Sequence, residues 1–277
     1  MTERYSEAVQ VARDYYNSDD ADNFYATIWG GEDIHIGLYN APDEPIREAS
    51  GRTVQHMASL LSIQPAHEAL DIGSGYGGAA RYLAASFGCS VMALNLSEKE
   101  NERARALSEE RGLSNKIEVV DGSFEAIPAA DDRFDVVWSQ DAILHSGQRV
   151  QVLQEVARVL KPGGHFVFTD PMQADDCPDD VLQPILDRIH LETLASPRFY
   201  REHLTRLGLQ EVCFEARTDM LTQHYGRVLQ ETEKHQAALI RTVSAEYVER
   251  MKQGLRHWID GGERGYLAWG IFVFRKP

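Results

Sequence analysis

The sequence predicts an α/β fold, with a doubly wound, mostly parallel sheet of seven strands covered by helices on both faces. From about residue 67, short apolar runs alternate with amphipathic helical segments, the pattern typical of βαβ units. After five such units come one more strand, a helical stretch and a final strand, which raises the strand number to seven. The last strand is expected to be antiparallel. Before residue 65 the pattern is helical, which adds an N-terminal helical cap.

The N-terminal region, residues 3–64, reads as helices around a loop at 30–44 that is rich in Gly, Asp and Pro. We therefore divide the chain into a cap at 1–64 and a larger domain at 65–277. Within the larger domain, a helical insertion at about 221–260 is expected to lie as a lid over the carboxyl edge of the sheet. The predicted strands lie at 67–73, 89–96, 116–122, 134–140, 165–170, 209–217 and 265–276.

The helices between these strands carry recognisable end signals. Gly88 stops the helix at 77–88, and Pro162 with Gly163 closes the one at 149–164. At 97–112, Ser97 is followed three residues later by Glu100, the spacing of a capping box. Further helices are predicted at 181–192 and 196–208.

Composition narrows the class of protein. The formal net charge is −15, which disfavours nucleic acids and anionic membranes as partners. Cys89, Cys177 and Cys213 are scattered and form no CxxC pair, so neither a disulfide framework nor a zinc site is expected. The N-terminus is charged and no apolar run approaches a bilayer span, which predicts a cytoplasmic protein. We expect a monomer or a weak homo-oligomer.

The strongest motif is LDIGSGYGG at residues 70–78. Its glycines follow a strand and open a helix, where they permit positive φ and close approach of a ligand to the backbone. Free N–H groups at the helix start suit a carboxylate or phosphate. Gly73, Gly75 and Gly78 also match the dinucleotide pattern GxGxxG, which leaves an NAD-dependent oxidoreductase open. Asp71 favours another family, because a dinucleotide site usually has an apolar residue there.

The segment at about 66–171 resembles the class I S-adenosylmethionine-dependent methyltransferases, which share a Rossmann-like fold. The resemblance implies that Asp71 orients the glycine turn and the methionine moiety of the cofactor, with main-chain contacts from Gly73 and Gly75. It implies that Asn95 replaces the usual acidic residue on the ribose, and that Asp121 recognises the adenine amino group. Around these positions the implied cofactor site includes Leu96, Gly122, Ser123, Phe124 and Gln140.

The acceptor site is expected after the fourth strand, in WSQDAILHS at 138–146. Asp141 and His145 are four residues apart, so they share a face if this turn is helical. The stretch resembles a segment of the phosphoethanolamine methyltransferases, in which a histidine pairs with a tyrosine of the N-terminal helix. That resemblance places Tyr16 beside His145 as the catalytic pair. It also implies that Tyr25, Trp29 and the Ile36–Gly37 turn border the cofactor.

The whole chain is more similar to the sarcosine/dimethylglycine N-methyltransferases, which form glycine betaine. Four stretches carry this similarity: DNFYATIWGGEDIHIGLYN, WSQDAILHS, FTDPMQADDCP and GYLAWGIF. Pro171 and Met172 stand where the phosphoethanolamine enzymes would grip a phosphate, which suits a smaller acceptor. The implied reaction is N-methylation of sarcosine and dimethylglycine by S-adenosylmethionine, with glycine, phosphoethanolamine or another small amine as alternative acceptors.

The chemistry of such acceptors suggests further site residues. Aromatic faces attract a quaternary ammonium, and Tyr25, Trp29, Tyr200 and Trp269 are candidate walls. A carboxylate is best bound by Arg, and Arg188 and Arg198 are both candidates. His35 lies in the loop expected to cap the site. The histidines show no metal-ligand spacing, and no catalytic metal is expected.

Overall fold

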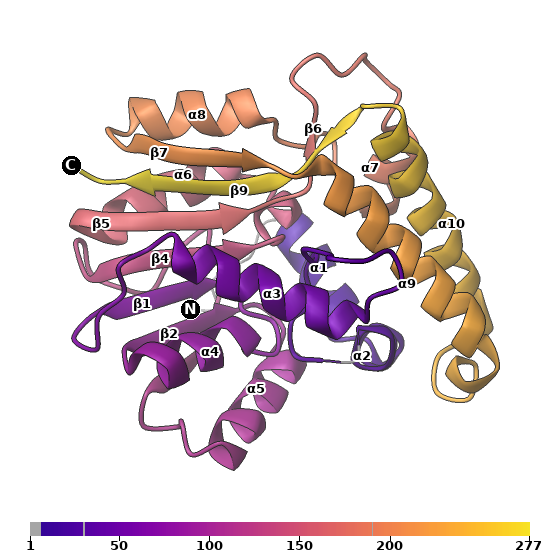
Figure 1. Cartoon of the computed structure of the whole chain (residues 1–277), viewed down its shortest axis with the longest axis horizontal. Helices are drawn as coiled ribbons and strands as arrows, with labels where there is room; N and C mark the ends of the chain where they lie inside the picture. The colour runs from indigo at the N-terminus through magenta and orange to yellow at the C-terminus, as the bar shows by residue number, and fades with distance from the viewer. Residues whose placement is uncertain (1–6, 30, 190) are drawn as a thin grey trace.

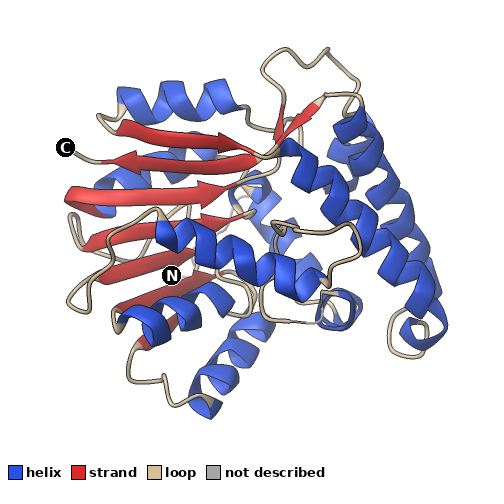
Figure 2. Ribbon diagram, in the orientation of Figure 1, coloured by secondary structure: helices blue, strands red, loops and turns tan. Residues whose placement is uncertain are grey.

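The computed structural model describes residues 7–29, 31–189 and 191–277 (Figure 1). The predicted architecture is confirmed, because a mixed sheet of seven strands lies between helical layers (Figure 2). Residues 3–6 of the predicted N-terminal segment, Gly30 of the loop and residue 190 of the predicted helix at 181–192 lie outside the described residues.

Seven strands form the main sheet. They are β1 (Glu68–Ile72), β2 (Ser90–Asn95), β3 (Ile117–Asp121), β4 (Phe134–Gln140), β5 (Leu160–Thr169), β7 (Gln210–Ala216) and β9 (Gly270–Arg275). Their order is β3-β2-β1-β4-β5-β9-β7. Neighbours from β3 to β5 are parallel, and β9 runs antiparallel to both β5 and β7, as predicted for the last strand. The strand order reverses between β1 and β4, the place where open α/β sheets bind ligands.

Helices cover both faces of this sheet because its strands are apolar on both sides. Leu70 and Ile72 of β1 belong to a core shared with α6 and α8, whereas Ala69 belongs to a core on the opposite face with α3 and α4. The covering helices are α3 (Ile46–Ser59), α4 (Gly78–Phe87), α5 (Glu98–Glu110), α6 (Arg149–Val159) and α8 (Pro197–Arg206).

A second group of helices lies beyond the carboxyl ends of the parallel strands (Figure 1). It consists of α1 (Glu7–Tyr16), α2 (Asp19–Ile28), the 3-10 turn η1 (Ile143–His145), α7 (Gln183–Ile189), α9 (Thr218–Leu239) and α10 (Ala245–Glu263). Phe24 of α2, Val228 of α9 and Met251 of α10 share one apolar cluster, which joins the N-terminal helices to the α9–α10 pair. No helix among the described residues is long and apolar enough to cross a membrane.

Two details of the strand pattern differ from expectation. The segment 160–164 was predicted as the end of a helix, but it is the start of β5: the N–H of Gly163 donates to Lys276 O at 2.8 Å, so this segment pairs with the chain beyond β9. The predicted final strand is broken at Trp269. Its first part, β8 (Leu267–Ala268), pairs with β6 (Met172–Gln173) as a separate ribbon, a long-range pairing that local sequence does not reveal.

Candidate active site

Both the backbone conformation and the space available to a side chain require glycine in the turn after β1. Gly73, Gly75 and Gly77 have φ of 72°, 51° and 74°, a region that residues with a Cβ avoid. A Cβ on Gly73 would lie 2.3 Å from the Cβ of Ala142, in the loop after β4. The turn can therefore hold β1 and β4 close together at the switch point only while this position is glycine.

The N–H groups of this turn are less free than the sequence suggests. Gly73 N–H donates to Leu94 O at 2.8 Å, and a Cβ on Gly78 would lie 2.1 Å from Asp33 Oδ1. The chain's own carboxylate thus lies against the start of α4, where an anionic ligand was expected. The N–H of Gly73 is therefore not available to an anionic ligand, and a main-chain contact from Gly73 must use its carbonyl oxygen.

Asp71 is a buried carboxyl group with an unused oxygen. It is the penultimate residue of β1, its exposed fraction is 3%, and its Oδ2 has no hydrogen-bond partner among the described residues. Burial raises its pKa to about 7. The hydroxyl of Ser74, within the glycine turn, is also buried without a partner. Buried polar groups of this kind are normally satisfied, so these two mark a place for a polar ligand.

The next motif, at the end of β2, pairs Asn95 with Glu100. Asn95 Nδ2 donates to Glu100 Oε2 at 2.9 Å, and burial raises the pKa of Glu100 to about 7. Only half of the predicted capping box forms: Ser97 accepts from the N–H of Glu100, but the Glu100 carboxyl group turns to Asn95. A helix-capping pattern thus concealed a second buried polar side chain beside Asn95.

The segment at the end of β3, residues 121–124, approaches the glycine turn through the ring of Phe124. The Phe124 ring would lie 3.6 Å from a Cβ on Gly73, which suits a residue beside a flat ligand. The Asp121 carboxylate, in contrast, is already used: one oxygen accepts from Asn101 Nδ2 at 2.8 Å and the other from Arg105 at 2.7 Å. Both partners must be shared or displaced for Asp121 to bind an adenine amino group. The neighbouring candidates are Gly122, whose N–H donates to Asn95 O, Ser123, whose hydroxyl accepts from Glu125 N, and the half-buried Leu96.

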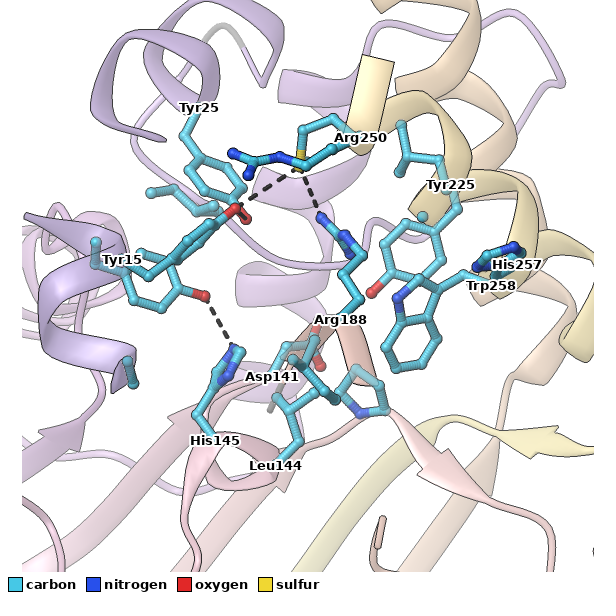
Figure 3. Close-up of a pocket in the computed structure, with 18 of the residues that line it drawn as sticks. Tyr15, Tyr25, Asp141, Leu144, His145, Arg188, Tyr225, Arg250, His257 and Trp258 are labelled. Carbon is cyan, nitrogen blue, oxygen red and sulfur yellow. Dashed lines mark hydrogen bonds between the residues drawn. The ribbon is translucent and has the colours of Figure 1, made fainter. Parts of the chain in front are cut away.

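Tyr16 and His145 come together although 129 positions separate them. The Tyr16 hydroxyl lies 2.9 Å from His145 Nε2, a contact that Figure 3 draws as the dashed line to the labelled His145. The two rings meet edge to face. Burial lowers the pKa of His145 to about 4, with smaller contributions from the charges of Arg188 and Arg149. Burial also raises the pKa of Tyr16 well above its usual value. Both groups are therefore neutral at pH 7.

Asp141 connects the capping loop to the sheet rather than pairing with His145. Its φ is 51°, and the helical turn η1 begins two residues later, so the predicted shared helical face does not exist. Asp141 Oδ2 accepts from the N–H of Ile36 at 2.7 Å, and Oδ1 accepts from Trp269 Nε1 at 2.8 Å. Gln140 holds the same loop through His35, with 3.0 Å between their side-chain nitrogens.

These elements enclose a cavity of about 680 Å³ at the carboxyl end of the sheet. It is walled by aromatic side chains from α1, α2, α9 and α10, and the charged Arg188 of α7 projects into it (Figure 3). Among the predicted site residues, the lining includes Tyr16, Tyr25, Trp29, His35, Ile36, Asp141, His145, Pro171 and Arg188; unpredicted members include Tyr15, His224, Tyr225, Tyr247 and Trp258.

Several predicted residues do not line this cavity. They include Arg198 and the cofactor candidates at the ends of β1 to β4 and just after them, Asp71, Gly73, Gly75, Asn95, Leu96, Asp121, Gly122, Ser123, Phe124 and Gln140. Four more are absent from the lining for reasons that the structure shows. Tyr200 is fully buried behind the sheet, where its hydroxyl donates to Asp170 at 2.7 Å. Trp269 is also fully buried, with its indole N–H used by Asp141. Met172 is buried in the β6–β8 ribbon, and Gly37 packs against Ala49. Tyr200 and Met172 are thereby corrected as residues of the cavity wall, because both are fully buried and neither lines the cavity.

His224 is a member of the cavity wall that no sequence pattern singled out. Its Nδ1 accepts from Gly37 N–H at 3.2 Å and faces the Tyr39 hydroxyl at 2.9 Å, which places the ring proton on Nε2. Nε2 and the indole N–H of Trp29 are both buried without a partner among the described residues. The cavity thus carries two unsatisfied N–H donors as well as a guanidinium group.

Comparison with known proteins agrees with this geometry. Residues 70–168 match a family model described as a methyltransferase domain. The chain is 60% identical to a sarcosine/dimethylglycine N-methyltransferase of Halorhodospira halochloris, over 100% of both chains. It is 54% identical to a sarcosine/dimethylglycine N-methyltransferase of Aphanothece halophytica, over 96% of both chains.

A solved structure extends the similarity to the fold. A candidate sarcosine dimethylglycine methyltransferase from Galdieria sulphuraria superimposes with a TM-score of 0.90 at 45% identity, covering 95% of this chain and 98% of that one. Identity at this level, over nearly the whole length of each protein, exceeds what a shared α/β fold alone accounts for. The chain therefore belongs to the family of S-adenosylmethionine-dependent sarcosine/dimethylglycine N-methyltransferases.

Proposed function

We propose that this protein transfers methyl groups from S-adenosylmethionine to the nitrogen of sarcosine and dimethylglycine, with glycine betaine as the final product. The single observation that carries the proposal is the Tyr16–His145 pair, which lies at an aromatic cavity beside the glycine turn after β1. The names of the similar proteins supply the acceptors.

The residues around the turn suit S-adenosylmethionine. The unpaired Oδ2 of Asp71 and the unpaired hydroxyl of Ser74 offer polar contacts to the methionine part, and the Asn95–Glu100 pair offers an amide and a carboxyl group to ribose hydroxyls. Phe124 offers a ring to the adenine. When bound, the cofactor supplies an electrophilic methyl group on a sulfonium.

The protein's own contribution is orientation and exclusion of water. The amine must arrive neutral with its lone pair free, and dimethylglycine then has no further proton to lose during attack. Alignment alone can contribute about 7–11 kcal/mol to such a reaction. Because His145 is held neutral and is a weak base, we assign the Tyr16–His145 pair chiefly to closing α1 over the site, with proton relay as a secondary role.

The aromatic walls suit the charge that develops on nitrogen. Tyr15, Tyr25, Tyr225, Tyr247 and Trp258 line the cavity from several sides (Figure 3). A desolvated cation on such faces gains up to about 2 kcal/mol. These rings can therefore stabilise the quaternary ammonium that forms as the third methyl group is added.

A direct assay tests the proposal. Purified protein is incubated with S-adenosylmethionine and, separately, sarcosine, dimethylglycine, glycine and phosphoethanolamine, and methylated products are quantified by mass spectrometry. We expect product from sarcosine and dimethylglycine only. Turnover of glycine or phosphoethanolamine alone would replace the proposed acceptors by those alternatives, and no turnover of any amine would refute the function.

The cellular location, the oligomeric state and the partners of the protein are part of the same proposal. We expect a cytoplasmic protein that is a monomer or a weak homo-oligomer and that does not bind nucleic acid. The net charge of −15 supports the last point, because it repels a phosphate backbone. Gel filtration and a DNA-binding titration at low salt test these expectations.

A further inference from the structure

We propose that Gly254, in the middle of α10, is a positioning residue: its missing side chain leaves a slot in which the Arg188 guanidinium lies, and this guanidinium binds the carboxylate of the amino-acid acceptor. The inference rests on the proposed function, because it explains how a small acceptor with a carboxylate is selected. It also chooses between the two arginines, Arg188 and Arg198, that the sequence left open.

Arg188 extends from α7 toward the middle of the cavity (Figure 3). Its terminal nitrogen donates to the Met251 sulfur at 2.7 Å, and the described residues place no carboxylate within ion-pair distance of it. A thioether is a weak acceptor, and a guanidinium carries five N–H donors. Most of the hydrogen-bonding capacity of this half-buried cation therefore remains for a ligand.

Other cations near the cavity are less suited to the role. Arg250 lines the rim, where its side chain is 66% exposed and Glu246 lies 3.8 Å away. Arg198 is exposed and does not line the cavity. Arg149 donates to the backbone oxygens of Leu144 and Thr193. His145 and His224 are held neutral by burial, which lowers the pKa of both.

Gly254 is required by the position of Arg188 and not by its own backbone. It lies inside the 19-residue helix α10 without a positive φ, where glycine weakens a helix. A Cβ there would lie 2.3 Å from Arg188 Nε, 2.5 Å from Cδ and 2.7 Å from Cζ. The three nearest atoms all belong to the end of the arginine side chain, so an added methyl group displaces the guanidinium rather than the helix.

This arrangement fits a carboxylate bound through two parallel N–H···O bonds, the geometry that a guanidinium prefers. The carboxylate compensates the charge of Arg188, and the bidentate contact fixes the direction in which the amine nitrogen points. An amine without a carboxylate lacks this anchor. The slot therefore predicts a preference for amino acids over neutral amines of equal size.

The test compares Gly254→Ala with Gly226→Ala. Gly226 lies inside α9, and a Cβ there meets no atom within 4 Å, so it controls for the general effect of alanine in a helix. Kinetics are measured with dimethylglycine and with N,N-dimethylethanolamine, which has no carboxylate. Calorimetry measures dimethylglycine binding in the presence of S-adenosylhomocysteine, and the affinity for S-adenosylhomocysteine itself.

We expect Gly254→Ala to raise the KM and the Kd for dimethylglycine by about tenfold or more, because the guanidinium is displaced. Its Tm should not fall, since alanine favours the helix. Its affinity for S-adenosylhomocysteine and its kcat/KM for N,N-dimethylethanolamine should remain within about twofold of the parent. Gly226→Ala should leave all of these values unchanged.

A double-mutant cycle separates the slot from a general packing effect. Arg188→Met should raise the KM for dimethylglycine by about tenfold or more, and Gly254→Ala should then add nothing in that background. Equal effects of Gly254→Ala with and without Arg188, or an unchanged KM and Kd in both single variants, would overturn the inference. If the parent protein methylates no amine, the proposed function fails, while the calorimetric preference for dimethylglycine still decides the role of the slot.

Discussion

Replacing Tyr16 by phenylalanine should impair methyl transfer without unfolding the protein. The change removes one hydroxyl, which lies 2.9 Å from His145 Nε2, and leaves the ring in place. His145 is partly buried, so its Nε2 then lacks a partner in a region of low polarity. Leaving a buried polar group unsatisfied costs about 1–3 kcal/mol. We expect part of this cost to appear as a weaker attachment of α1 to η1.

The size of the kinetic effect follows from that free energy. A cost of about 1–3 kcal/mol in the closed state corresponds to a fall of about 5- to 150-fold in kcat/KM for dimethylglycine. If the same cost instead lowered the free energy of unfolding of the whole protein, Tm would fall by only about 2–4 °C per kcal/mol in a chain of this size. Activity should therefore fall while the protein remains folded.

The matched control is Tyr15→Phe. The Tyr15 hydroxyl lies 2.7 Å from that of Tyr247 and 3.2 Å from that of Tyr25, so its removal disturbs the same wall without touching His145. Initial rates are measured between pH 6 and 9 at saturating S-adenosylmethionine. In this range the rate should follow deprotonation of the acceptor amine in both variants, since the pKa of His145 lies near 4. Full activity of Tyr16→Phe, or an equal loss in Tyr15→Phe, would refute the reasoning.

Three further predictions test other parts of the site. Gly73→Ala should abolish S-adenosylhomocysteine binding in calorimetry and lower Tm. The reason is that the new Cβ would lie 2.3 Å from the Cβ of Ala142, at a position where φ is positive. Retained binding would contradict the role of the turn. The pKa of Asp71 is raised by burial from 3.8 to about 7, so the folded state binds this proton more tightly and ligand-free stability should fall as pH rises from about 4 to 7. Urea unfolding at pH 5 and at pH 8.5 measures this difference in stability, and Asp71→Asn should make the difference smaller. The same variant should weaken cofactor binding. An unchanged pH dependence of stability would exclude Asp71 as its source. Tyr200→Phe should lower the free energy of unfolding by about 1–3 kcal/mol, because Asp170 Oδ2 loses the tyrosine hydroxyl while Oδ1 keeps the N–H of Leu144. The KM for dimethylglycine should stay within about twofold, and a large rise in KM would return Tyr200 to the substrate site.

Much of this fold and the cofactor end of the site could be read from the sequence, because the responsible signals are local. Period-2 and period-3.6 patterns report burial within one strand or helix, and LDIGSGYGG reports a turn whose glycines must have positive φ. Tyr16 and His145 are a different case, because the sequence paired them only through resemblance to known enzymes. Where a local pattern had two meanings, as with Glu100, the sequence favoured the helix cap over the buried contact with Asn95.

The acceptor end of the site was decided by tertiary structure. Tyr200 and Tyr225 are the same type of residue, yet Tyr200 packs behind the sheet against Asp170, whereas Tyr225 faces the cavity. The choice of Arg188 over Arg198 depends on α7 crossing α10 at a glycine, a contact between positions 66 residues apart. Sequence by itself determined where the chain turns and which segments are buried, since those follow from each residue and its near neighbours. Only packing decided which side chains share the cavity, because the rotation of each helix about its axis is set by the helices it meets.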